Sequence, residues 1–127
     1  MKDIVYDVQK GHTLYAVFLE LKEWNTIEIG KLGTFSFAPG VYVYVGSAKK
    51  NMEKRLARHV QIDKKKRWHL DYLRPYCQIT KIISYETSIG ECGLASKFKK
   101  KGKVCVPRFG ASDCKCGGHL IFLGECK

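Results

Sequence analysis

The sequence lacks any apolar run that approaches the roughly 20 residues needed to cross a bilayer. Its first residues also lack the apolar core of a secretory signal peptide. We therefore expect a cytoplasmic protein with no membrane partner. Hydrophobic residues make up 45% of the 127-residue chain, which excludes a disordered composition. Because neither an internal repeat nor a linker-like segment interrupts it, we expect a single domain over residues 1–127.

Acidic residues are scarce in the second part of the chain. There are 23 Lys and Arg against 12 Asp and Glu, a net charge of +11. Residues 1–46 hold four lysines and five acidic residues, whereas residues 47–127 hold nineteen basic and seven acidic residues. This one-sided excess favours nucleic acid as the partner over a role in solubility or heat adaptation. We expect the nucleic-acid contacts to come from Lys49, Lys50, Arg58, Lys64, Lys65, Lys66 and Arg67.

Paired Cys-x2-Cys motifs are absent, although the chain has six cysteines. Disulfides are uncommon in cytoplasmic proteins, so we expect thiols that are buried or that bind a metal. Cys114, Cys116 and His119 resemble part of a zinc site, which Cys92 or Cys105 could complete. A tight glycine-rich turn with buried thiols is the alternative.

Alternating apolar residues predict strands in the first part of the chain. Segment 13–21 is apolar on both faces, which is typical of a central strand. A turn at 23–26, a short strand at 27–29 and a further turn and strand over 31–37 follow. The next strand, 40–46, alternates valines with Tyr42 and Tyr44 and ends at Gly46. We expect Tyr42 to be a packing residue.

Helical and extended segments alternate in the rest of the chain. Asn51 is a reasonable N-cap for a helix over 52–60, whose apolar stripe is Met52, Leu56, Ala57 and Val60. A short helix is expected at 68–73, a strand at 78–85 and a helix at 91–98. An extended segment at 104–106, a loop at 107–118 and a last strand at 119–123 complete the chain. The predicted fold class is α+β, a central and mainly antiparallel sheet flanked by helices.

A few polar residues have the chemistry of a phosphate site. Arg55 and His59 stand four apart on one helix and project side by side, where they could bind a phosphate and move a proton. Glu91 near a helix N-terminus could hold Mg²⁺. Each residue also has a structural interpretation: a solvated basic face for Arg55 and His59, and a favourable dipole interaction for Glu91. The phenols of Tyr15 and Tyr44 could simply be buried.

The order of these residues resembles the GIY-YIG nuclease superfamily. Tyr44-Val45-Gly46 is similar to its second signature, and Thr13-Leu14-Tyr15 stands where the first would be. The closer resemblance is to a small stand-alone branch of that superfamily. It is carried by Tyr-Val-Gly-Ser-Ala (44–48), Arg-x-x-Arg-His (55–59), Trp-His-x-Asp-Tyr-Leu (68–73), Glu-Cys-x-Leu-Ala (91–95) and Gly-Ala-Ser-Asp-Cys-x-Cys (110–116). The segment between Tyr15 and Tyr44 is longer than usual and contains an extra hairpin around Trp24.

The resemblance implies a DNA endonuclease with a one-metal mechanism. Glu91 would hold Mg²⁺ or Mn²⁺, and Arg55 would bind the scissile phosphate and stabilise the transition state. Tyr15, with Tyr44 or His59, would help to activate the attacking water. The alternative is a non-catalytic, basic nucleic-acid-binding module on the same fold. The enzymatic hypothesis requires that Tyr15, Tyr44, Arg55, His59 and Glu91 lie together.

Overall fold

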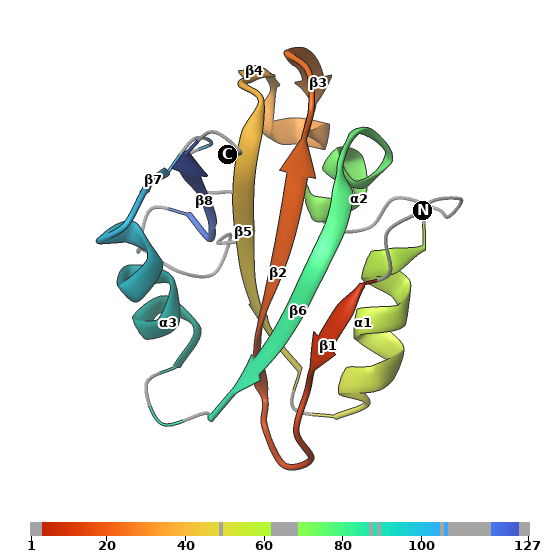
Figure 1. The fold of residues 1–127 in the computed structure, drawn as a ribbon, viewed down its shortest axis with the longest axis vertical. Helices are drawn as coiled ribbons and strands as arrows, with labels where there is room; N and C mark the ends of the chain where they lie inside the picture. Colours follow the sequence, from red (N-terminus) through yellow and green to blue (C-terminus); the bar gives the residue numbers. More distant parts are fainter. Residues whose placement is uncertain are drawn as a thin grey trace.

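A six-stranded sheet forms the centre of the computed structural model (Figure 1), which describes residues 4–48, 50–61, 69–86, 88, 90–104, 106 and 118–124. The strand order is β1-β6-β2-β5-β8-β7. The bounds are β1 (Val5–Asp7), β2 (Leu14–Leu21), β5 (Gly40–Ser47), β6 (Gln78–Tyr85), β7 (Lys103–Val104) and β8 (Leu120–Gly124). All neighbouring strands are antiparallel except β1 and β6, which are parallel. The predicted α+β fold with a mainly antiparallel sheet is confirmed.

The pair β2–β5 is the middle of this sheet. Its register joins Leu14 to Ser47 at one end and Leu21 to Gly40 at the other. Alternation on β2 sends Tyr15, Val17, Leu19 and Leu21 into one buried cluster and Leu14 and Ala16 into a second one. The prediction of a central strand buried on both faces is therefore confirmed. The eight residue pairs between β2 and β5 fix which side chains meet at each end of these two strands.

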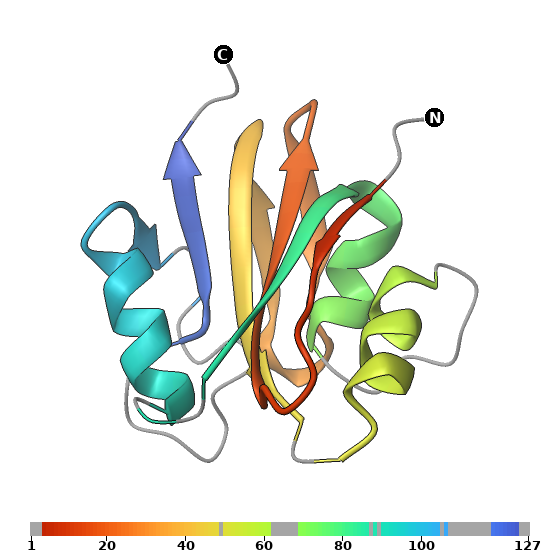
Figure 2. The ribbon, with the colours of Figure 1, turned by 60° about the horizontal axis from the view of Figure 1, so that its bottom comes forward.

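Helices cover both faces of the sheet (Figure 2). On one face, α1 (Met52–Val60) and α2 (His69–Leu73) bury Leu56, Leu70 and Leu73 in the cluster that contains Tyr15. On the other face, α3 (Gly90–Lys99) buries Leu94 and Ala95 against Leu14 and the valines of β5. Figures 1 and 2 show α3 beside β5 and β8, away from β1 and from the helices α1 and α2.

A separate hairpin is inserted between β2 and β5. It consists of β3 (Asn25–Glu28) and β4 (Thr34–Phe37), joined through a 3-10 turn at Gly30–Leu32. The two strands pair only with each other within the described residues. The hairpin follows the Leu21 end of β2, so it does not disturb the register at the Tyr15 end. Trp24, at its base, is 68% exposed.

The structure differs from the expected elements in two places. The strand β1 was not predicted, because its three residues are all exposed and its parallel partner β6 lies far along the chain. On α1, His59 is buried and Ala57 is exposed, because Tyr15 and Tyr44 offer His59 partners inside the core. The helix α2 ends at Leu73 as expected, and Pro75 lies in the 3-10 turn Arg74–Tyr76 that follows it.

The remaining elements follow the predicted ranges closely, apart from the shorter β7. The predicted loop at 107–118 lies outside the described residues except for Gly118. Across the parts of the chain that the structure describes, no helix is both long and apolar enough to span a membrane.

Candidate active site

Three aromatic rings meet where β2 begins and β5 ends. Tyr15 and His59 have ring centroids 5.5 Å apart, and Tyr44 and His59 5.7 Å apart. The Tyr15 hydroxyl and His59 Nε2 are within hydrogen-bond distance at 2.7 Å. Tyr15 and His59 are each only 1% exposed. The helix α1 thus places an imidazole inside the sheet core, in contact with both phenols.

Gly46 makes room for the Tyr15 hydroxyl. Tyr15 and Gly46 are paired across β2 and β5, and a methyl group at position 46 would overlap the Tyr15 hydroxyl and ring. Gly46 is not among the glycines with a positive φ, so the need here is for space rather than for an unusual backbone conformation. This contact explains in physical terms why a glycine follows Tyr44-Val45.

Ser47 joins Arg55 to Glu91. The Arg55 guanidinium donates through Nη1 to the Ser47 carbonyl oxygen. The Ser47 hydroxyl donates to Glu91 Oε2 over 3.1 Å. Arg55 comes from α1 and Glu91 from α3, so Ser47, at the end of β5, connects residues from the two helix layers. The sheet end is the place where both layers become accessible to one ligand.

Glu91 is held by a second partner, His119. His119 Nδ1 lies 3.1 Å from Glu91 Oε1, and His119 Nε2 lies 3.6 Å from the sulfur of Cys92. His119 is 2% exposed, whereas the Glu91 side chain is 31% exposed. Each carboxylate oxygen therefore has a partner among the described residues, and the group still reaches solvent.

Burial controls the acid–base state of the two phenols. Loss of hydration raises the pKa of Tyr15 far above its usual value, and the neighbouring Tyr44 and Glu91 act in the same direction. The pKa of Tyr44 is raised by the same loss of hydration and then by Glu91. The positive charge of Arg55 opposes both shifts. Both phenols consequently stay neutral at ordinary pH.

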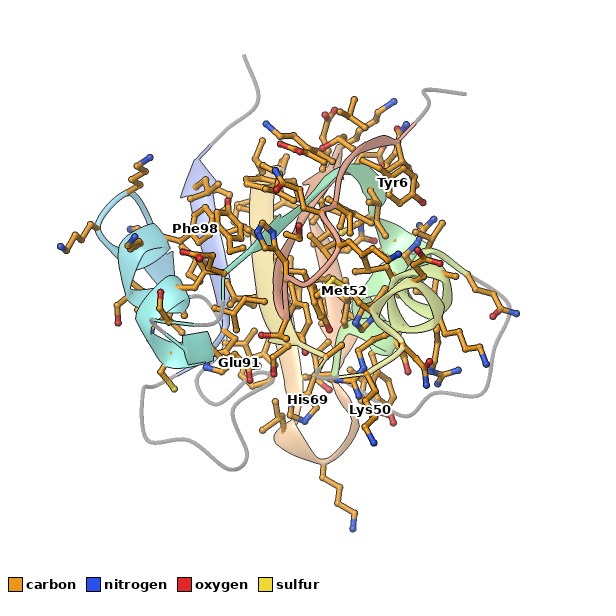
Figure 3. The ribbon with its side chains drawn as sticks, turned by 90° about the horizontal axis from the view of Figure 1, so that it is seen from below. Tyr6, Lys50, Met52, His69, Glu91 and Phe98 are labelled. Carbon is orange, nitrogen blue, oxygen red and sulfur yellow. The ribbon has the colours of Figure 1, made fainter. Side chains whose placement is uncertain are left out.

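The five predicted residues do lie together. Tyr15 and Tyr44 contact His59, Arg55 and Glu91 share Ser47, and the charges of Arg55 and Glu91 act on both phenols. Figure 3 looks at this end of the molecule and shows Glu91 at the start of α3 and Met52 on α1, with the sheet between them. Residues from β2, β5, α1 and α3 therefore form one polar cluster at one end of the sheet.

A cavity of about 620 Å³ lies beside this cluster. Its walls are the segment 8–13, Ala48 and the first turn of α1. The Ala48 amide donates to the Thr13 carbonyl, which ties these walls to the ends of β2 and β5. Lys10, His12 and Lys54 line it and supply groups that can bind an anion.

The residues predicted to bind nucleic acid differ in their surroundings. Lys50 is exposed at the start of α1. Arg58 instead forms an ion pair of 3.0 Å with Asp71 Oδ2, whose side chain is fully buried, so it joins α1 to α2. Its binding to nucleic acid stays a prediction. Lys49, Lys64, Lys65, Lys66 and Arg67 lie outside the described residues.

The expectation that all cysteines are reduced is wrong. Cys92 forms a disulfide bond, and Cys77 is a free, buried thiol. Spacing in the sequence does not reveal which sulfurs the fold brings within bonding distance. The disulfide removes Cys92 from the possible thiolate ligands of a zinc site. Zinc at Cys114, Cys116 and His119 stays a prediction, because both cysteines lie outside the described residues.

The residues fit a Mg²⁺ or Mn²⁺ ion that has one carboxylate ligand. Within the described residues, no group of three His, Cys, Asp or Glu side chains could hold a metal. Glu91 is the only one of the five clustered residues with a carboxylate, and each of its oxygens has a second lone pair beyond the bond to Ser47 or His119. Mg²⁺ commonly keeps several waters and takes one or two carboxylates plus a substrate phosphate.

The described features define an α+β domain with a polar cluster of Arg, His, Tyr and Glu at one end of its sheet. The chain belongs to the family described as "Domain of unknown function DUF123", whose model matches residues 14–127. No curated protein and no solved structure matches the chain.

Two residues of the cluster were not foreseen in their present role. Ser47 was only part of a motif, and His119 was considered as a zinc ligand. Neither has a sequence signal for its contact with Glu91, since Glu91 is 44 positions from Ser47 and 28 from His119. Only the sheet order, which places β5 beside β8 under α3, brings them together.

Proposed function

We propose that this chain is a divalent-metal-dependent endonuclease that hydrolyses phosphodiester bonds in DNA, acting in the cytoplasm. The observation that carries the proposal is the convergence of Arg55, His59, Tyr15, Tyr44 and Glu91, from four elements, at one end of the sheet. These are the residues that the resemblance to GIY-YIG nucleases requires. A protein that only binds nucleic acid would have no need for the Glu91 carboxylate in this cluster, in a chain with a net charge of +11.

Arg55 has the role of binding the scissile phosphate. Its bond to the Ser47 carbonyl orients the guanidinium at the sheet end. A guanidinium has five N–H donors, which allows it to hold this carbonyl and phosphate oxygens together. As charge builds on the phosphate in the transition state, these charge-assisted bonds become stronger.

Glu91 would hold the cation, with its orientation fixed by Ser47 and His119. A divalent cation bound there would supply positive charge to the scissile phosphate and its leaving oxygen. A hydrogen bond such as the one from His119 commonly orients a carboxylate that binds a metal ion.

Tyr15 and His59 provide a route for the proton of the attacking water. Because its pKa is raised, Tyr15 does not act as a phenolate. Its oxygen accepts a proton from the water while its own proton passes to His59 Nε2, 2.7 Å away. The tautomer of His59 with its proton on Nδ1 is required for this transfer. Tyr44 packs against His59 with its ring, and its hydroxyl lies in the field of Glu91 and Arg55.

Cleavage assays test the proposal directly. Supercoiled plasmid and branched DNA are incubated with Mg²⁺ or Mn²⁺, and the products are followed with and without EDTA. Wild-type protein should cut only with the cation, and Arg55→Ala and Glu91→Gln should each slow cutting by about 100-fold or more. The matched control is Glu28→Gln, an exposed carboxylate on the inserted hairpin, which should cut as wild type does.

Two results would count against the enzyme. One is an inactive wild type over the whole panel of substrates, and the other is undiminished cutting by both site variants. Salt-sensitive binding of DNA without any product would favour the non-catalytic binding module instead.

A further inference from the structure

A second basic surface lies on the opposite side of the sheet from α1. It is a groove of about 390 Å³ between α3 and the end of β6. Tyr85, Leu94 and Phe98 form its floor, and Lys97, Lys100 and Lys101 form its rim. Figure 3 shows Glu91 at the start of α3 and Phe98 near its other end. None of the residues predicted to bind nucleic acid belongs to this surface.

The floor consists of half-buried aromatic rings. Phe98 meets Phe18 with centroids 5.8 Å apart and Tyr85 with centroids 6.5 Å apart, both edge to face. Tyr85 and Phe98 are each partly accessible. The helix α3 packs against β5, β8 and β2, and its Phe98 reaches Tyr85 at the end of β6. Open aromatic rings on a polar surface can accept another flat apolar group.

The rim carries positive charge without nearby compensation from α3. The three lysines are exposed, and no ion pair within the described residues involves them. The acidic groups at this edge are Asp7 on β1, which contributes to a raised pKa of Tyr85, and Glu86 after β6. The field is therefore positive along α3 and negative toward β1, so a phosphate chain would follow the α3 side.

The groove begins close to the candidate active site. The registers place Tyr85 beside Leu14 and Leu14 beside Ser47. Neighbouring strands are about 4.8 Å apart, so Tyr85 and Ser47 are separated by about 10 Å. Ser47 in turn binds Glu91. A nucleic-acid chain with one phosphate at Arg55 would therefore be able to continue toward Tyr85.

We propose that this groove binds a single-stranded segment of nucleic acid, with a base stacked on Tyr85 and Phe98 and phosphates on Lys97 and Lys101. A single strand is the occupant because its unpaired bases offer free faces to aromatic rings, whereas duplex bases already stack on one another. The further statement that this segment continues the strand held at Arg55 rests on the proposed function. Substrates with single-stranded arms are then preferred to blunt duplexes.

Binding is measured by fluorescence anisotropy with labelled oligo-dT of about twelve nucleotides, in EDTA so that no cleavage occurs. Lys97→Gln/Lys101→Gln should weaken binding and lower the slope of log affinity against log salt by about 1.4, the value for two contacts on a single strand. Tyr85→Leu should weaken binding by about five-fold or more, whereas Tyr85→Phe, which keeps the ring, should not.

The matched control is Lys22→Gln/Lys31→Gln, which removes the same charge near the inserted hairpin. Equal loss of affinity in the two lysine pairs would overturn the proposal, as would unchanged binding by Lys97→Gln/Lys101→Gln or equal behaviour of the two Tyr85 variants. Failure of the proposed function is a separate result: oligo-dT binding that depends on the groove, with no cutting of any DNA, would contradict the enzyme and support the groove.

Discussion

Two tyrosines on one face of β5 have different surroundings. Tyr42 donates from its hydroxyl to the Ala38 carbonyl over 2.6 Å and packs against Phe37 and Phe122. Tyr44, two residues on, contacts the imidazole of His59 and the ring of Tyr15. The two residues are alike in type, strand and burial. Their difference comes from what the chain brings to each end of the sheet.

The comparison extends to the whole length of the β2–β5 pair. Toward Gly40 the partners are apolar residues of the inserted hairpin, such as Ile27 and Phe37. Toward Gly46 they are polar groups from α1 and α3. The first end is stabilised by burial of apolar area, and the second holds charges and phenols that must keep their positions relative to one another. We expect substitutions at the first end to change stability and those at the second to change cleavage.

The largest effect should come from Gly46→Ala. The new methyl group would overlap the Tyr15 ring and displace it from His59. Because a displacement of about 1 Å in a reacting group costs about 100-fold, cleavage of plasmid DNA should fall by at least that factor.

The matched control is Gly40→Ala, at the other end of β5. There a methyl group would meet the Gly124 backbone, and the φ of +152° is strained for any other residue. This variant should unfold at lower temperature yet cut DNA as wild type does when it is folded. Equal loss of cleavage in the two variants would remove the distinction between the two ends.

Tyr44→Phe and Tyr42→Phe should separate activity from stability. Tyr42→Phe removes one buried hydrogen bond and should lower the free energy of unfolding by about 1 kcal/mol without changing cleavage. Tyr44→Phe should slow cleavage about ten-fold, because the hydroxyl lies where Arg55 and Glu91 both act. Urea unfolding and initial cleavage rates measure the two quantities. Slower cutting by Tyr42→Phe than by Tyr44→Phe would reverse the assignment.

The smallest effect is a pH dependence of stability. The pKa of Tyr44 is raised in the folded state, so above about pH 10 the unfolded chain releases a proton that the folded state keeps. Stability from this group is full below about pH 10 and falls by about 1.4 kcal/mol per pH unit above it.

Urea unfolding of wild type and Tyr44→Phe between about pH 9 and about pH 11 gives the difference. Over this range wild type should lose about 1.4 kcal/mol more stability than Tyr44→Phe, because the unfolded phenol is half ionised at about pH 10 whereas the lysines titrate in both proteins and cancel. Identical slopes would show that the Tyr44 phenol is not held neutral by burial.

Much of the fold could be predicted because the sequence patterns are local. Alternation predicted the strands Leu14–Leu21 and Gln78–Tyr85 almost to the residue. The helix α1 begins at Met52 with Asn51 at its N-cap position, although the Asn51 side chain makes no capping hydrogen bond. The strand β1 could not be predicted, since Val5–Asp7 is short and depends on pairing with β6. The buried position of His59 was also missed, because helical periodicity alone does not say which polar residues find partners in the core.

The candidate site divides in the same way. The residue types and their order indicated Tyr15, Tyr44, Arg55, His59 and Glu91, and these do converge. The sequence did not reveal the contacts made by Ser47 and His119, because each depends on tertiary pairing across many positions. The ion pair of Arg58 with Asp71 was also not predicted, because it depends on how α1 packs against α2.

The contact between Tyr15 and Gly46 has a consequence for variation within the family. The two positions share one volume across a strand pair, and the constraint at position 46 is one of space. A larger residue at 46 is therefore compatible only with a smaller one at 15. An alignment of DUF123 sequences should show these two columns covarying, with glycine wherever an aromatic ring is opposite. Covariation of positions 15 and 46 would therefore report their contact from sequences alone.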